Sequence, residues 1–151
     1  MGDDGFDSPE GAAMVGFPAK YCRVIASRVE GDDGYVLLNT GSPGSPYLYG
    51  VNCWRVNGRW FEGGSGNGPG WEQRGHDPDV GTLSFWGDAP ADAEMARVEF
   101  EGALLMAPVV DGAYLVVWWR VPLPQTWPRV TAFQIAGCWV HFPDISFGLP
   151  R

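Results

Sequence analysis

The feature of this sequence that most constrains its fold is the alternation of short apolar runs with turn-forming residues. Strand-like runs occupy residues 21–29, 35–40 and 47–56, and Gly, Pro, Asn or Asp residues separate each run from the next. Asn57 and Gly58 follow the third run, and Asn-Gly is a strong signal for a two-residue hairpin turn because both positions need positive φ. No amphipathic helical stripe exceeds about two turns. Roughly nine or ten short strands at this spacing predict an all-β protein.

The second half of the chain continues the pattern. Ala96, Val98 and Phe100 fall on one face of a strand and the charged residues between them on the other, which predicts a half-buried strand. The following run, "ALLMAPVVDGAYLVVWWRV", is apolar on both faces around a single Asp-Gly turn. We therefore expect residues 103–121 to form a hairpin in a central, covered position of a sheet.

These patterns favour a two-sheet antiparallel β-sandwich of immunoglobulin-like type, with a closed β-barrel as the alternative. A chain of 151 residues is ordinary for one domain. We expect one sandwich domain over residues 18–143, in one set or two sequential sets of hairpins. Residues 1–17 are expected to be a flexible or docked tail, and residues 144–151 an irregular one.

Part of the sequence resembles a known class of domains. The segment "ARVEFEGALLMAPVVDGAYLVVWW", followed by "WPRVTAFQIAG", resembles the closing hairpins of small immunoglobulin-like β-sandwich domains of high-GC bacteria. In those domains a strand, an Asp-Gly turn, an aromatic strand and a "VTAF" strand recur. The resemblance covers residues 96–137 and implies the sandwich fold, but it implies no active site. One lysine against nine arginines is also typical of a GC-rich bacterial source.

The charge balance bears on partners. The formal net charge of −8 disfavours nucleic acids and anionic membranes, because their phosphates would repel the chain. A protein partner or a homo-oligomer is compatible with this charge. The acidic N-terminal segment does not read as a secretory signal, and no run of about 18 apolar residues occurs, so we expect a cytoplasmic protein. Cys22, Cys53 and Cys138 form no CxxC motif and are expected to be buried free thiols.

The stretch "FEGGSGNGPGWEQRGHDPDVG", residues 61–81, is rich in glycine but fits no phosphate-binding motif. No lysine follows Lys20, so a P-loop is excluded, and Pro69 stands where a GxGxxG fingerprint starting at Gly64 needs its last glycine. We expect no cofactor. The stretch is interpreted as a long connection of about 17 residues without secondary structure, either a lid docked by Trp71 or a recognition loop.

Catalytic chemistry has only weak candidates. His76, Asp77 and Asp79 lie close together in sequence and, with His141, allow a low-ranking hypothesis of a hydrolase or metal enzyme. No GxSxG motif is present, and no catalytic residue is assigned.

Aromatic residues point to binding. A two-residue turn at Asn57-Gly58 would pair Arg55 with Trp60 and Trp54 with Phe61. Flat exposed rings stack on sugars and anchor protein interfaces. The leading hypothesis is therefore a non-enzymatic domain that binds a protein partner or itself, and the alternative is a carbohydrate-binding module. The candidate ligand-binding residues are Tyr47, Tyr49, Trp54, Arg55, Trp60 and Trp71.

Overall fold

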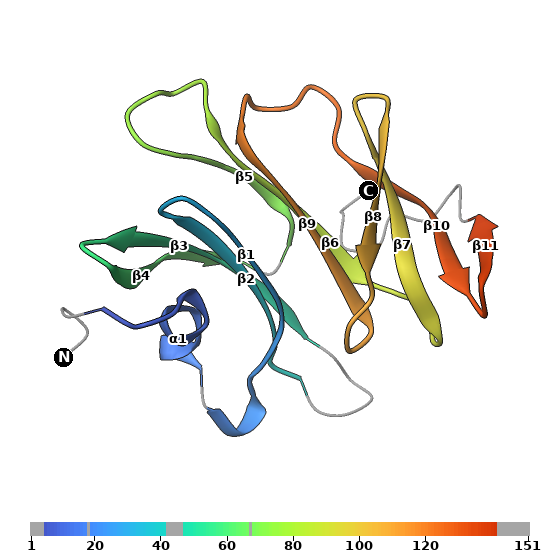
Figure 1. Ribbon diagram of the computed structural model, residues 1–151, viewed down its shortest axis with the longest axis horizontal. Helices are drawn as coiled ribbons and strands as arrows, with labels where there is room; N and C mark the ends of the chain where they lie inside the picture. The colour runs from blue at the N-terminus through green and yellow to red at the C-terminus, as the bar shows by residue number, and fades with distance from the viewer. Residues whose placement is uncertain (1–4, 18, 42–46, 67, 142–151) are drawn as a thin grey trace. The chain divides into compact units, whose positions relative to one another are not determined.

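A computed structural model describes residues 5–17, 19–41, 47–66 and 68–141 of the chain (Figure 1). The chain divides into two compact units, Met1–Gly68 and Pro69–Arg151. Within the described residues, three antiparallel sheets and one short α-helix make up the fold, and none of the sheets closes into a barrel. The prediction of an antiparallel β-rich protein is confirmed, and the barrel alternative is wrong. The tail predicted at residues 144–151 lies outside the described residues.

The first unit contains a four-stranded sheet of consecutive hairpins in the order β1-β2-β3-β4. Asn57 and Gly58 adopt φ values of 52° and 78° between the last two strands, and the pairing of Arg55 with Trp60 is the one that the sequence predicts. The strands are β1 (Arg23–Glu30), β2 (Asp33–Asn39), β3 (Leu48–Val56) and β4 (Arg59–Gly66).

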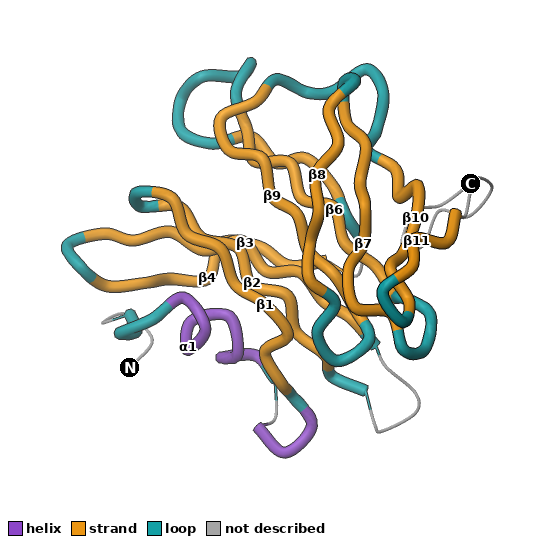
Figure 2. Tube along the Cα trace, turned by 45° about the vertical axis from the view of Figure 1, so that its right-hand side comes forward, coloured by secondary structure: helices purple, strands orange, loops and turns teal. Residues whose placement is uncertain are grey.

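The N-terminal segment covers one face of this sheet. Helix α1 (Pro9–Ala13) begins with a proline, and the Ser8 hydroxyl caps it by accepting a hydrogen bond from the Gly11 N–H at 3.1 Å. Two 3₁₀ turns, Met14–Gly16 and Ala19–Tyr21, follow the helix. Figure 1 and Figure 2 both show α1 lying against this four-stranded sheet. Its small residues enter a core of Ala12, Ala13, Cys22, Val36, Leu38, Val51, Cys53 and Trp60.

The start of the segment also extends the sheet. Phe6 forms a β-bridge to Trp60, with two backbone hydrogen bonds of 2.8 Å, so the segment pairs with the edge of β4. Arg59 pairs with Asp7 and donates a second hydrogen bond to the Gly5 carbonyl at 3.0 Å. The described part of the N-terminal tail is therefore docked on the first unit.

The second unit contains two sheets that share one core. A three-stranded sheet has the order β5-β6-β9, and a four-stranded sheet has the order β11-β10-β7-β8. Phe85 and Tyr114 from the first of these sheets and Phe133 from the second form successive ring contacts with centroids 5.9 Å apart. The strands are β5 (Gly70–Gln73), β6 (Gly81–Asp88), β7 (Ala93–Phe100), β8 (Ala103–Pro108), β9 (Ala113–Val121), β10 (Arg129–Ile135) and β11 (Cys138–His141).

The predicted hairpin over residues 103–121 is wrong in its pairing. The turn at Asp111 and Gly112 does form, with φ values of 52° and 78°, but it carries the chain from one sheet to the other. β8 pairs with β7 and ends its sheet, whereas β9 pairs with β6. The expectation that the first half of this apolar run is central and covered is also wrong, because β8 is an edge strand with exposed side chains.

The glycine-rich stretch contains more regular structure than the sequence predicts. β4 continues to Gly66, and β5 occupies residues that were expected to be an irregular connection. Trp71, in β5, is half-buried and its indole Nε1–H donates to the Val121 carbonyl at 2.9 Å. Two strands therefore occupy much of the predicted unstructured loop, residues 74–80 remain a loop between β5 and β6, and Trp71 docks β5 onto its own sheet.

The prediction for the cysteines holds for two of the three. Cys22 and Cys53 are buried free thiols, but Cys138 is exposed because it begins the edge strand β11. No helix in the described part of the chain is long and apolar enough to span a membrane.

Candidate functional site

The tyrosines predicted to bind a ligand lie together at one end of β3. Tyr47 is 50% exposed, and its ring centroid lies 5.4 Å from that of Tyr49. Tyr49 also contacts Phe17, at 5.3 Å. The neighbouring Tyr47 raises the pKa of the Tyr49 hydroxyl by charge repulsion and by a hydrogen bond between the side chains. The three rings form a small aromatic cluster of the first unit.

The other aromatic candidates of the first unit lie near the Asn57-Gly58 turn. Trp60 is 4% exposed and belongs to the core, and the guanidinium of Arg55 lies 5.0 Å from its ring centroid. Arg55 also forms an ion pair with Asp32 at 3.0 Å. Trp54 is 42% exposed and lies against Gly63, on the other face of the sheet. Trp60 therefore packs, whereas Trp54 remains accessible.

The histidine and aspartate candidates lie in the second unit. His76 is exposed in the loop after β5, where Asp77 accepts a hydrogen bond from the Asp79 N–H at 2.9 Å. His141 ends β11 and contacts Arg97. Among the described residues, no three His, Cys, Asp or Glu side chains gather closely enough to hold a metal ion.

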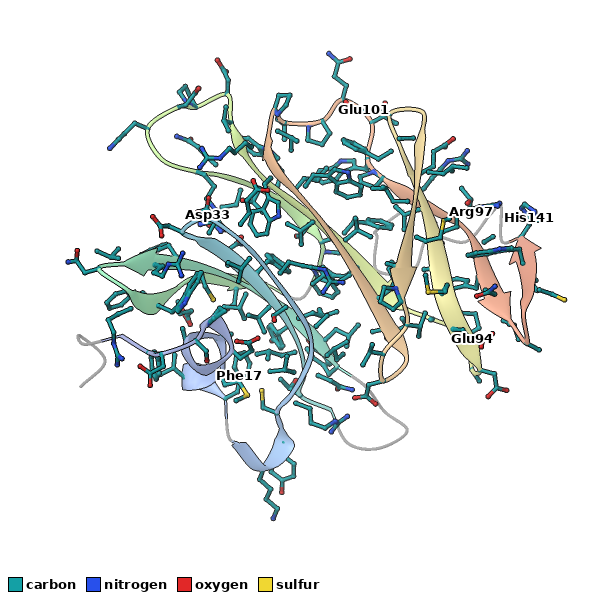
Figure 3. All side chains as sticks on the ribbon, viewed as in Figure 1. Phe17, Asp33, Glu94, Arg97, Glu101 and His141 are labelled. Carbon is teal, nitrogen blue, oxygen red and sulfur yellow. The ribbon has the colours of Figure 1, made fainter. Side chains whose placement is uncertain are left out.

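The structure brings together a set of side chains that no sequence pattern had singled out. They lie on the outer face of the four-stranded sheet, and we call them the four-strand face. Arg97 is central to it: its Nε–H donates to the Thr131 hydroxyl at 3.0 Å and its Nη2 lies 3.4 Å from His141 Nδ1. Figure 3 shows Arg97 and His141 side by side on this sheet. The four-strand face consists of Leu104, Met106, Arg97, Thr131, Trp139 and His141.

The register explains how this face crosses all four strands. Met106 on β8 is directly opposite Arg97 on β7, and the guanidinium of Arg97 lies 5.5 Å from the ring centroid of Trp139 on β11. The Glu94 carboxylate accepts a hydrogen bond from the Gly137 N–H at 3.1 Å and so holds the turn that precedes Trp139. The result is a continuous row of apolar, cationic and aromatic groups.

β8 supplies the apolar part of this surface. Leu104 is 53% exposed and Met106 57% on this face, and strand β8 contains no charged residue. Leu105, on the opposite face of β8, is 38% exposed. The exposure of these residues was not predicted from the sequence, because an apolar run on both strand faces normally indicates burial. The available signal was Pro108, since proline within a sheet is confined to edge strands and strand ends.

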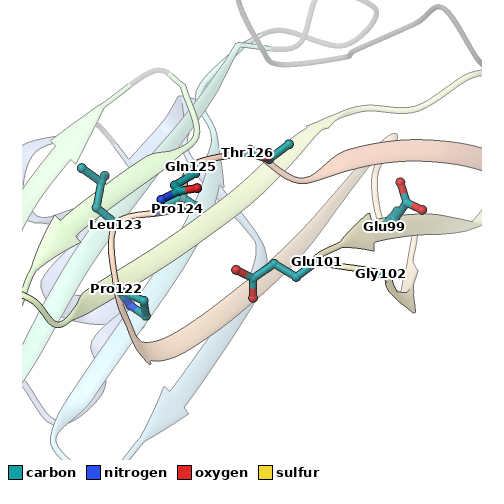
Figure 4. Close-up of a pocket in the computed structure, with 8 residues that line it drawn as sticks. All are labelled: Glu99, Glu101, Gly102, Pro122, Leu123, Pro124, Gln125 and Thr126. Atoms are coloured by element: carbon teal, nitrogen blue, oxygen red, sulfur yellow. The ribbon is translucent and has the colours of Figure 1, made fainter.

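A groove opens at the end of the same sheet, beside the β7–β8 turn (Figure 4). Its volume is about 530 Å³. Its two ionisable side chains are carboxylates, of which Glu99 is paired with Arg129 at 2.7 Å. The lining residues are Glu99, Glu101, Gly102, Pro122, Leu123, Pro124, Gln125 and Thr126. The groove is thus acidic on the side of Glu99 and Glu101 and of mixed polar and apolar character on the side of residues 122–126.

One titratable pair lies away from this surface. Tyr114 is fully buried between the two sheets, and desolvation, together with the nearby Asp88, raises the pKa of its hydroxyl far above the ordinary range. Desolvation also raises the pKa of the Asp88 carboxyl. Desolvation thus disfavours the charged form of both groups, and the Tyr114 hydroxyl, buried in the core, stays neutral and serves packing rather than proton transfer.

Comparison of the chain with protein-family models, with curated proteins and with solved structures finds no significant match.

Proposed function

We propose that this protein is a non-enzymatic interaction domain that binds a protein partner or a second copy through the four-strand face of its second unit. The observation that carries the proposal is the continuity of exposed Met106 with the stacked pair of Arg97 and Trp139. Exposed apolar residues are normal when scattered singly, but here they adjoin one another and a cationic–aromatic stack.

The chemistry of the face supports this proposal. Tryptophan and arginine dominate the binding energy of protein interfaces, and methionine is enriched there because its flexible side chain adapts to a partner. Arg97 is already held by Thr131 and by the Trp139 ring, so little of its side-chain entropy remains to be lost on binding. A preorganised arginine beside exposed apolar groups is the arrangement expected of an interface centre.

We further propose that the second unit is an immunoglobulin-like β-sandwich. The strand order supports this: the first, second and fifth of its seven strands form one sheet, and the third, fourth, sixth and seventh form the other. Immunoglobulin-like and related sandwiches distribute seven strands between two sheets in this general way. Such folds occur with many functions, so the function is argued from the four-strand face and not from the fold.

The proposal is tested by affinity purification with quantitative mass spectrometry, using tagged wild-type chain and two variants, Trp139→Ala and Met106→Ser. Trp139→Ala removes the ring beneath Arg97, and Met106→Ser removes an exposed apolar side chain from the same row. We expect proteins retained by the wild type to be lost or strongly reduced with both variants, with the direct contact verified on the purified pair.

Val29→Ser and Val56→Ser are matched controls, because both valines are exposed in the first unit. They should retain the same proteins as the wild type. Identical retention by all five chains, with circular dichroism showing intact folds, would contradict the proposal.

A further inference from the structure

β8 has an open edge onto which another strand can pair. The strand order of its sheet ends at β8, and no described residue pairs with its outer side. An unpaired edge presents a row of backbone N–H and C=O groups, which makes it a template for strand addition. From its geometry and chemistry we infer that β8 pairs with β8 of a second copy, in an antiparallel two-fold arrangement centred on Leu105.

The turn before β8 determines which backbone groups point outward. Both residues of the turn at 101–102 have positive φ, 52° and 82°, so Phe100 and Ala103 close a two-residue hairpin as a hydrogen-bonded pair. Hydrogen-bonded and non-hydrogen-bonded pairs alternate along an antiparallel ladder. The N–H and C=O groups of Leu104 and Met106 therefore point away from β7, toward the open edge.

Only one two-fold register matches these groups well. Centring the two-fold axis on Leu105 places Leu104 opposite Met106 of the second copy, and the reverse, so that each pair exchanges two backbone hydrogen bonds. Leu105 then lies opposite its own counterpart on the other face of the sheet. Centring the axis on Met106 would instead require an N–H from Pro108, which has none.

The side chains of β8 distinguish it from the other sheet edges. Natural edge strands commonly carry charges that discourage pairing. β8 contains no charged side chain, so two copies can pair along it without repulsion between like charges, although the chain as a whole carries a net charge of −8. Each of the other strands at a sheet edge contains at least one ionisable side chain: Arg23, Arg28 and Glu30 in β1; Arg59 and Glu62 in β4; Glu72 in β5; Arg120 in β9; and His141 in β11.

A second copy fits this edge because the edge is complementary to itself. Leucine meets methionine twice and leucine meets leucine once, so every exposed side chain of the pairing region gains an apolar neighbour. Three half-exposed side chains per copy cover less area than the roughly 1,200 Å² of a standard interface. The dimer is therefore weak and forms reversibly as concentration rises.

This inference rests on the self-association branch of the proposed function, and Leu105 allows the two to be tested separately. Leu105 points to the opposite side of β8 from Leu104 and Met106, so substituting it leaves the four-strand face unchanged. A monomeric chain that still retains a protein partner through Trp139 would overturn the dimer alone. If the chain dimerises but retains no other protein, the pairing of β8 is supported and the binding of a different protein is contradicted.

The experiment is sedimentation velocity of full-length wild type, Leu105→Lys and Leu105→Glu, each over a wide concentration range. The wild type should shift from monomer toward dimer, and each variant alone should remain monomeric because two like charges then face each other across the two-fold axis. An equimolar mixture of the two variants should regain association, since lysine then faces glutamate. Reductant is kept present because exposed Cys138 would otherwise cross-link copies.

Leu123→Lys is the control, an exposed leucine in the segment after β9 that should dimerise like the wild type. A wild type that stays monomeric at every concentration overturns the inference. A wild-type dimer that is unaffected by either Leu105 variant assigns association to another surface, and failure of the mixture to associate rules out the axis at Leu105.

Discussion

The ring of Trp71, on β5, lies directly against Gly81, at the start of the neighbouring strand β6. A Cβ atom at position 81 would come within 2.5 Å of Trp71 Cε2, and it would also collide with the backbone carbonyl of Glu72. Trp71 is held in this place by its hydrogen bond to the Val121 carbonyl. Because Gly81 has no side chain, the ring of Trp71 can pack there and hold β5, within the glycine-rich stretch, on its sheet.

Gly81→Ala is expected to destabilise the protein by about 1–3 kcal/mol, because an inserted methyl group must displace both the Trp71 ring and backbone. Thermal unfolding followed by circular dichroism measures the loss. Gly70→Ala, in the neighbouring strand, is the control, since a Cβ there meets nothing within 4 Å. Equal stability of the two variants would mean that the close packing of Trp71 on Gly81 is absent in solution.

Trp60 and Trp54 lie in the same hairpin but are expected to respond very differently to truncation. Trp60→Ala should cost about 3–5 kcal/mol in free energy of unfolding, because it empties the core beneath α1. Trp54→Ala should cost under about 1 kcal/mol, since its ring remains accessible to solvent. Urea titration of both variants checks this, and a larger loss for Trp54 would contradict the assignment of Trp60 to the core.

Asp88→Asn should stabilise the protein near neutral pH. Desolvation raises the pKa of the Asp88 carboxyl in the folded state, so folding favours the protonated form. The contribution of Asp88 to stability is most favourable below the unfolded pKa of about 3.9 and declines as pH rises through the raised folded pKa.

Because Asp88 remains accessible to solvent, the gain from Asp88→Asn at pH 7 should be only a few tenths of a kcal/mol. Differences in melting between variant and wild type, measured from pH 3 to pH 7, should grow with pH. Glu101→Gln, at an exposed turn, serves as the control. A variant that is less stable than the wild type at pH 7 would refute the prediction.

The three cysteines should differ in their reactivity toward a maleimide. Cys138 is exposed and should react first, whereas Cys22 and Cys53 are buried and should react only on unfolding. Burial also raises the pKa of the Cys22 thiol, which further lowers its thiolate population. Intact-mass spectrometry should show one adduct in the native protein and three in denaturant. Cys138→Ser should abolish the native adduct; rapid native labelling of that variant would contradict the burial of the other two.

Local features of the fold were predictable where turn chemistry is distinctive. Asn57-Gly58 predicted both a hairpin and its register, because a two-residue turn leaves only one pairing for the flanking strands. Asp111-Gly112 correctly predicted a turn, but it did not predict that the strands on either side of the turn, β8 and β9, belong to different sheets. The turns at Glu101-Gly102 and Ala136-Gly137 were missed, since glutamate and alanine seldom adopt positive φ.

The candidate site was not predictable from the same patterns. Apolar residues on both faces of β8 are compatible with a buried central strand and with an exposed edge, and hydropathy alone does not separate the two. Arg97 and Trp139 are far apart in sequence and meet only because β10 pairs with both β7 and β11. Aromatic content suggested a binding surface, but it could not show that Trp60, one of the candidates, packs inside the first unit.

The sequence by itself determined the antiparallel β class, the positions of most strands and the hairpin turns whose residues tolerate positive φ, because these depend on side-chain alternation and local backbone sterics. Only the tertiary structure decided that β8 ends its sheet, that Cys138 is exposed and that Met106, Arg97 and Trp139 form one surface. Those outcomes depend on which strands pair at long range, and pairing reflects the packing of whole sheets around a shared core rather than any local pattern.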